Sequence, residues 1–358
     1  MKKNIIQLAV LGLISINFTA CRDTETSPVA QAAEQTAVNF DQSTGKNSAQ
    51  VIINTYQDFD KLAQILVDKV NAITPNNQAQ IDAAKQAWKD TRVAWERSEG
   101  FLYGPTKTLN LDPALDTWPV DVAGMDKIIK SPLPITPAVI EANAETRGFH
   151  LIEFLLWGEN SNKTAAQLTA RELEYLKAAS HDLKNNTAKV LSEWTKYAVN
   201  FGNAGQTGAK YTSYKGIYEE LVAGMITIAN EVSTGKIETP LNGNAGSYKL
   251  DAEESRFSNN SKADFADNIR SIQNIYLGNY NINQAHQYSV SSFVKQKNAA
   301  LDTEIQNKIQ EAIKAIEAIP GTFTQAIINN RNEVKTAQSK VADLQVILDG
   351  KLKTLVKS

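Results

Sequence analysis

Residues 147–158 (RGFHLIEFLLWG) restrict the fold of this chain more than any other segment. Between Phe149 and Trp157, every side chain is apolar except those of His150 and Glu153. A helix that is apolar on nearly all sides is buried inside a protein. Three residues of an α-helix advance by about 300°, so His150 and Glu153 should occupy neighbouring positions on one face. The sequence therefore predicts a buried helix that carries an imidazole and a carboxylate.

Burial of these two ionisable groups costs free energy unless they are paired or bound to a metal. Imidazole nitrogen and carboxylate oxygen together suit iron, zinc or manganese better than calcium or magnesium. His150 and Glu153 supply only two ligands, so other parts of the fold would have to complete a metal site. A hydrogen-bonded His–Glu pair without a metal explains the pattern equally well.

The N-terminus has the layout of an export signal. A basic start and an apolar run over residues 5–16, too short to span a membrane, precede small residues and Cys21. This order resembles a bacterial lipobox, although an ordinary signal with an incidental cysteine is the alternative. We expect residues 1–20 to be a signal peptide and Cys21 to carry the lipid. Residues 21–48, rich in Ser, Thr, Gln and Ala, would form a flexible tether.

Composition and charge narrow the class of protein. Glycine and proline number only 18 and 10 and fall mostly between long periodic segments, which predicts an all-α fold. The formal net charge is −2 with both signs interspersed, so nucleic-acid binding has no electrostatic support. Cys21 is the only cysteine, which excludes an intrachain disulfide and a thiolate metal site.

Helical spacing and breaks predict the order of the elements. A Gly-, Asn- and Ser-rich linker over 236–260 separates an N-terminal helical bundle over 49–235 from a C-terminal bundle over 261–358. The expected helices cover residues 50–72, 78–98, 120–129, 137–157, 170–201, 211–232, 262–277 and 285–319, with a last one after Pro320 to about residue 355.

Two further segments carry charges that could meet the buried pair. Trp88, Arg92, Trp95 and Glu99 follow one another at spacings of four, three and four, so they share one helix face. A partly buried ion pair of Arg92 is the simpler explanation of that stripe. The irregular segment 110–121 adds three carboxylates, each of which could instead cap a turn: Asp112, Asp116 and Asp121.

Several separated blocks resemble one family. Residues 148–153 match the Gly-x-His-x-x-Glu signature of the imelysin-like proteins, and the stripe from Trp88 to Glu99 with the following 101–105 is similar to that family's first block. Residues 116–119 resemble its Asp-x-Trp-Pro segment, and parts of 255–278 resemble its C-terminal block.

The resemblance implies two helical-bundle domains packed around an interdomain cleft that holds the signature. It also implies export, a connection with bacterial iron uptake and iron-transport proteins as partners. The family carries a peptidase label, but this chain has Phe154 where a His-x-x-Glu-His zinc peptidase needs a second histidine. His181 and His286 lie in distant polar segments, so the peptidase interpretation has little support and enzymatic activity is left open.

We therefore expect an exported lipoprotein, anchored to the outer membrane and facing the periplasm or the cell surface. It would bind iron, or zinc or another divalent metal, or a small iron-containing ligand. A structural or partner-binding lipoprotein without metal is the first alternative, and a metal-dependent peptidase the second. The predicted metal ligands are His150, Glu153, Glu99 and Asp116. The predicted surrounding residues are Arg92, Trp95, Asp112, Asp121, Gly148, Phe149 and Arg270.

Overall fold

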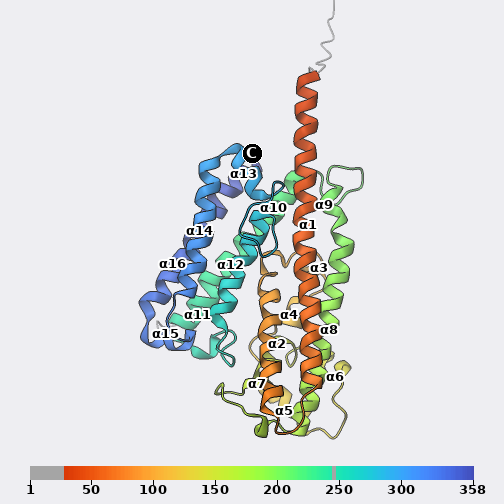
Figure 1. The fold of residues 1–358 in the computed structure, drawn as a ribbon, viewed down its shortest axis with the longest axis vertical. Helices are drawn as coiled ribbons and strands as arrows, with labels where there is room; N and C mark the ends of the chain where they lie inside the picture. The colour runs from red at the N-terminus through yellow and green to blue at the C-terminus, as the bar shows by residue number, and fades with distance from the viewer. Residues whose placement is uncertain (1–27, 244–246) are drawn as a thin grey trace, which may run out of the picture. The chain divides into compact units, whose positions relative to one another are not determined.

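Every regular element in the computed structural model is a helix within residues 28–243 and 247–358, the part of the chain that the structure describes (Figure 1). The prediction of an all-α fold is confirmed. Within the same ranges, no helix combines the length and the apolar character needed to cross a membrane. The predicted signal peptide, residues 1–20, and the predicted lipidation site Cys21 lie outside the described residues.

The first helix is longer than the pattern predicted. Helix α1 (Pro28–Asn71) begins well before residue 50, so the described part of the predicted tether is helical. Alanine and glutamine, which are frequent there, have high helix propensity even without an apolar stripe. The described residues after Asn39 form one compact unit. The division of this unit into bundles over 49–235 and 261–358 stays a prediction.

Five helices begin and end close to their predicted bounds. Thr169 forms the predicted capping box before the helix that begins at Ala170. The side chain of Asn77 caps the helix that begins at Gln78 by accepting a hydrogen bond from the amide of Gln80. The five are α2 (Gln78–Glu96), α5 (Val122–Lys130), α10 (Tyr214–Glu231), α8 (Ala170–Tyr197) and α12 (Ser261–Leu277).

Other predicted helices are interrupted. The segment predicted as one helix over 137–157 forms α6 (Pro137–Glu141) and α7 (Gly148–Trp157), and 285–319 forms α13 (Val290–Lys297) and α14 (Ala299–Glu317). The last segment contains α15 (Phe323–Asn329), α16 (Arg331–Ile347) and α17 (Lys353–Lys357). Short helices also occur in predicted irregular regions or at helix ends: α3 (Pro105–Thr108), α4 (Asp112–Leu115), α9 (Val199–Gly202) and α11 (Glu238–Asn242).

Helix α7 begins at Gly148, close to the end of α4. This residue has a φ of +81°, a backbone conformation that L side chains rarely adopt. A Cβ atom at Gly148 would lie 2.5 Å from the carbonyl oxygen of Leu115, so α7 approaches the end of α4 closely. Nine of the ten residues of α7 are buried, as its apolar sequence predicted.

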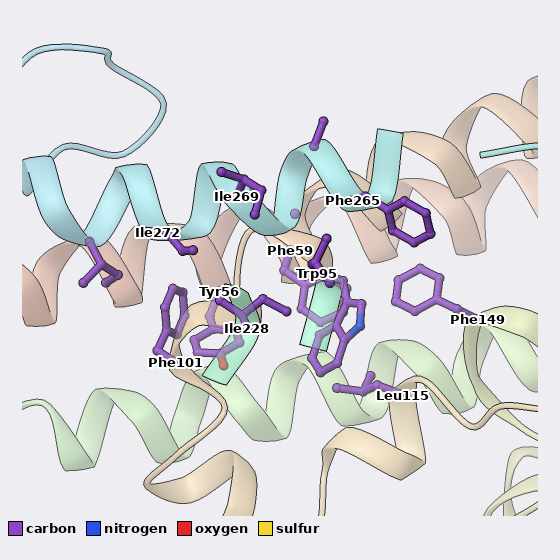
Figure 2. Packing of buried hydrophobic residues seen from close by; sticks show 14 of the residues in the cluster. Tyr56, Phe59, Trp95, Phe101, Leu115, Phe149, Ile228, Phe265, Ile269 and Ile272 are labelled. Carbon is purple, nitrogen blue, oxygen red and sulfur yellow. The ribbon is translucent and has the colours of Figure 1, made fainter. Parts of the chain in front are cut away.

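Helix α12 occupies a central position within residues 40–358. It packs against α2, α10 and α14, and Figure 1 shows α10 and α12 between the α14–α16 helices and the α2–α8 helices. Figure 2 shows the core where Phe265, Ile269 and Ile272 of α12 face aromatic residues of α1 and α2. Phe59 and Trp95 are in contact there, with ring centres 5.6 Å apart.

Candidate metal site

His150 and Glu153 contact each other inside the protein, and neither side chain is exposed. Nδ1 of His150 lies 2.9 Å from Oε2 of Glu153. The other oxygen of Glu153 accepts two hydrogen bonds of 2.7 Å, from the backbone N–H and the hydroxyl of Ser258. Because both oxygens of Glu153 have protein partners, this carboxylate orients the imidazole ring. Nε2 of His150 is the nitrogen that faces the rest of the cluster.

Asp116 joins the irregular loop to both predicted helices. Its Oδ1 lies 3.1 Å from Nε2 of His150 and pairs with Nη1 of Arg92. Its Oδ2 accepts a hydrogen bond of 2.7 Å from the indole N–H of Trp95. The ring of Trp118 lies beside the imidazole of His150, with ring centres 4.7 Å apart and the planes tilted by 60°. The loop therefore brings one of its carboxylates to the buried histidine.

Arg92 is fully buried and lies among carboxylates from three segments. Its Nη2 is 2.5 Å from Glu96 and 2.7 Å from Glu254, and its Nε is 3.7 Å from Asp264. The guanidinium lies over the ring of Phe149 at 5.1 Å. Arginine suits this position because its planar group stacks on an aromatic ring while several N–H groups donate to carboxylates.

Lys236 supplies the second permanent positive charge. It belongs to the π-helical turn Val232–Ile237, a type of distortion that is frequent at functional sites. Its Nζ lies 3.1 Å from Glu254, 3.5 Å from Glu99 and 3.7 Å from Glu96. Asn268 of α12 also donates a hydrogen bond of 2.5 Å to Glu96.

Negative groups outnumber positive ones in this cluster. Arg92 and Lys236 are the permanent cations, and His150 is the third group that can carry a positive charge. The buried Oδ2 of Asp264 also lacks a hydrogen-bond partner in the described part of the chain. The carboxylates are those of Glu96, Glu99, Asp116, Glu153, Glu254 and Asp264.

The excess of negative charge changes which groups hold protons. Burial raises the pKa of Glu96 and of Glu99 well above the usual range, and it raises the pKa of Asp264 to about 7 despite nearby Arg92. Burial alone would lower the pKa of His150, but the Asp116 carboxylate outweighs it and raises that pKa to about 9. Burial would likewise raise the pKa of Asp116, but Arg92 and His150 hold it well below its usual range.

A cavity of about 490 Å³ opens onto the cluster. Burial raises the pKa of Asp112, which lines it, to about 6. Acidic side chains dominate the walls and two lysines oppose them, so the cavity favours a cationic ligand. The charged lining residues are Glu99, Asp112, Asp116, Glu231, Asp251, Glu254, Lys236 and Lys249.

Two groups of side chains could each hold a metal ion. Ligand atoms of Asp116, His150 and Glu254 lie within 4.8 Å of one another, and so do those of Glu96, Glu99 and Asp116. Asp116 belongs to both groups. The first group offers one imidazole nitrogen and two carboxylate oxygens, a donor set that suits iron, zinc or manganese.

Two of the predicted residues lie elsewhere. Asp121 caps α5 by accepting a hydrogen bond of 2.9 Å from the amide of Gly124. Arg270 lines a different cavity. The remaining histidines are also separate from the cluster: His181 contacts Asn71, and His286 contacts Tyr288.

Sequence reasoning missed several contributors to the cluster, among them Asp264 and Asn268 of α12. Glu96 could have been found, because it follows Arg92 at the i, i+4 spacing of a helical ion pair. Lys236, Glu254 and Ser258 fall in the segment assigned to a linker, where composition predicted a domain boundary. Ser258 lies in the block that resembles the family's C-terminal block, but no local pattern indicates that Lys236 and Glu254 turn inward.

Comparisons with known proteins relate this chain to one family and to similar proteins of known sequence or structure. The family model described as Imelysin matches residues 52–349. Iron-regulated protein A of Synechococcus elongatus is 27% identical over 370 residues, which covers 100% of this chain and 95% of that protein.

Two solved structures have a similar fold. A candidate iron-regulated protein A precursor from Parabacteroides distasonis has a TM-score of 0.78 and 27% identity, over 88% of this chain and 95% of that one. An imelysin-like protein from Psychrobacter arcticum has a TM-score of 0.70, over 89% and 96% of the two chains. Its 12% identity makes it a likeness of fold alone.

Proposed function

The chain belongs to the imelysin family, and from this membership we propose that it binds a metal cation, iron in the first instance, in the acidic cavity beside His150. The observation that carries the proposal is the convergence of Asp116, His150 and Glu254, whose ligand atoms lie within 4.8 Å of one another. Iron comes first because two similar proteins have names that refer to regulation by iron, and because imidazole and carboxylate ligands suit it.

The residues divide into ligands and supporting groups. Asp116, His150 and Glu254 would hold the ion, with Glu99 and Glu96 as the second group of carboxylates. The position of Glu153 favours a supporting role, because a metal-bound histidine commonly donates its other ring N–H to a carboxylate. We expect that N–H at Nδ1, which leaves the Nε2 lone pair for the metal.

Charge also supports a cationic ligand. Arg92 and Lys236 neutralise only part of the cluster, so the remaining carboxylates must take up protons or another cation. Raised pKa values at Glu96, Glu99 and Asp264 indicate that protons fill this role in the metal-free protein. A divalent ion would replace those protons, so binding should release them.

Elemental analysis of protein purified without a metal-affinity tag tests the proposal. We expect a transition metal near one equivalent, with iron most abundant, and its loss in the variants Asp116→Asn, His150→Ala and Glu254→Gln. Asp121→Asn is the matched control, because Asp121 lies in the same loop but caps α5, and asparagine also caps helices.

Two results would count against metal binding at this site. One is purified protein without metal whose chelator-treated form does not bind Fe²⁺, Zn²⁺ or Mn²⁺ either. The other is metal content that stays unchanged in the three ligand variants. A folded, stable protein with the first result would favour the partner-binding alternative without metal, and the second result would place the metal at another site.

We also propose export and lipid attachment at Cys21, on the strength of the lipobox-like order of residues before it. The membrane would be the outer one, with the protein facing the periplasm or the cell surface. Replacing Cys21 by alanine should move the protein from the membrane fraction to the soluble fraction. Retention of the variant in the membrane fraction would refute the anchor.

A further inference from the structure

A second cavity, of about 310 Å³, lies beside the contact between α2 and α12. Among the described residues, it shares no lining side chain with the acidic cavity. Neighbouring residues at the C-terminal end of α2 and in α12 contribute to the acidic cluster and to this second cavity. Glu96 and Asn268 meet in the acidic cluster, whereas Arg97 and Asp267, each next to one of them in sequence, meet beside this second cavity at 2.8 Å.

Positive side chains and amides line this cavity. The cations are Arg97, Arg270 and Lys314, and the acidic lining residue is Glu317. One carboxylate oxygen of Asp267 accepts from Nε of Arg97 at 2.8 Å and from Nη1 of Arg270 at 3.1 Å. A single carboxylate therefore holds both guanidinium groups in place.

Several N–H donors of these cations have no partner. In residues 28–243 and 247–358, no hydrogen bond or ion pair involves Nη2 of Arg97, Nε of Arg270 or Nζ of Lys314. The three cations face the two carboxylates of Asp267 and Glu317, which leaves an excess of positive charge. The unpartnered donors favour a ligand that accepts hydrogen bonds, and the excess of positive charge favours an anion.

Asn274 is an independent sign of a ligand. It lines the cavity with only 3% of its surface exposed. Its Oδ1 accepts a hydrogen bond of 3.1 Å from the backbone N–H of Asn281, but its Nδ2 is buried without any partner in the described residues. Buried polar groups in native proteins are almost always hydrogen-bonded, so this amide nitrogen indicates a missing acceptor.

We propose that this second cavity binds a small oxyanion, the carboxylate or phosphate group of a small molecule, between Arg97, Arg270 and Asn274. Guanidinium groups bind both kinds of oxyanion through paired N–H donors. Gln273 and Gln310 also line the cavity, and their amides would contact the remainder of the ligand. The site is separate from the proposed metal site and does not depend on it.

Calorimetric titration of the chelator-treated protein with inorganic phosphate and with succinate tests the proposal. The two probes distinguish a phosphate site from a carboxylate site, and binding of at least one of them in the presence of chloride is expected. Asn274→Asp is the most specific variant. It keeps the acceptor for the Asn281 amide and replaces the unpartnered donor by a carboxylate oxygen, so affinity should fall about tenfold or more.

Lys314→Gln provides a second variant that does not threaten folding, because Lys314 is exposed. We expect it to weaken binding about threefold, as loss of one partly screened charge would. Lys308→Gln is the matched control. It lies on the same helix, α14, but pairs with Asp343 at 3.2 Å and does not line the cavity, so affinity should stay within about twofold.

His150→Ala should also leave anion affinity unchanged, which separates this site from the metal site. The proposal is overturned if neither probe binds. It is also overturned if a folded Asn274→Asp protein binds the probe as the wild type does, or if Lys308→Gln weakens binding as much as Lys314→Gln.

Discussion

Glu153 and Asp116 contact opposite nitrogens of one imidazole: Oε2 of Glu153 lies 2.9 Å from Nδ1 of His150, and Oδ1 of Asp116 lies 3.1 Å from Nε2. The ring is thus held between a carboxylate from its own helix and one from the loop. Ser258 fixes the other oxygen of Glu153 by two hydrogen bonds, so the carboxylate on the Nδ1 side has little freedom to turn. Glu153 therefore orients the imidazole ring, whereas Asp116 contacts the nitrogen that would bind a metal ion.

Replacing Glu153 by glutamine should weaken metal binding by about 10- to 100-fold, the usual effect of losing a carboxylate that orients a metal-bound histidine. The amide keeps the size of the side chain but cannot accept hydrogen bonds at both of its ends. Titration of the chelator-treated protein with Fe²⁺ or Zn²⁺ measures the change.

Glu145→Gln is the matched control for this experiment, because Glu145 precedes α7 and its side chain is exposed. It should bind metal as the wild type does. Equal affinity in Glu153→Gln and the wild type would show that Glu153 does not orient the ligand.

Stability of the metal-free protein should fall as pH rises from about 6 to about 9. The pKa of His150 is raised from 6.5 to about 9, so its contribution is fully present below 6.5 and disappears as pH rises through about 9. A shift of this size corresponds to stabilisation on the order of 3 kcal/mol. Asp264 has its pKa raised to about 7 and adds a loss in the same direction from about pH 4 to about 7.

Urea unfolding with a chelator present, at about pH 6, 7.5 and 9, measures this dependence. Asp116 acts in the opposite direction, but its lowered pKa affects stability only in strong acid. His150→Gln should flatten the decline above about pH 6.5, whereas His286→Gln, outside the cluster, should retain it. A flat profile for the wild type would contradict the proposed protonation of the cluster.

Local pattern predicted the helices and the buried pair because both depend on residues close in sequence. The spacing of His150 and Glu153, the burial of α7 and the capping box at Thr169 all follow from a single segment each. The start of α7 at Gly148 was not predictable in this way, because the backbone there lies close to Leu115, which belongs to another segment.

The full charge cluster also depends on tertiary structure. Glu254 and Lys236 come from a segment with the composition of a linker, yet they lie beside Arg92 and Glu99. Asp121 looked equivalent to its loop neighbour Asp116 in sequence, but it caps a helix instead. Which of several similar carboxylates faces a cluster is decided by the path of the backbone.

Lys236→Met should strengthen metal binding and weaken the metal-free fold. The ammonium group lies 3.1 Å from Glu254 and 3.5 Å from Glu99, so it competes with an incoming cation for the same carboxylates. Its removal should raise metal affinity about tenfold and lower the metal-free free energy of unfolding by about 3 kcal/mol, since buried carboxylates lose a counter-ion. Metal titration and urea unfolding measure the two effects.

Lys249→Met controls for charge in the same cavity, because Lys249 also lines it but is exposed. It should change both quantities much less. If Lys236→Met reduced metal affinity in a folded protein, Lys236 would be helping to hold the ligand, and the competition would be excluded.

Gly148→Ala should destabilise the protein more than Gly208→Ala, and the comparison separates two physical effects. Both glycines have positive φ, +81° and +78°, so both variants incur about 1–2 kcal/mol of backbone strain. A Cβ at Gly208 meets nothing within 4 Å, whereas one at Gly148 would lie 2.5 Å from the Leu115 carbonyl oxygen. Forcing α7 and α4 apart should cost about 1–3 kcal/mol more.

Urea unfolding of the two variants gives that difference directly. The same displacement would move His150 relative to Asp116, because these residues follow Gly148 and Leu115 closely on the two segments. Metal affinity should therefore fall in Gly148→Ala and stay unchanged in Gly208→Ala. Equal unfolding free energies would mean that the close approach of α7 to α4 is absent in solution, and the position of His150 would need another explanation.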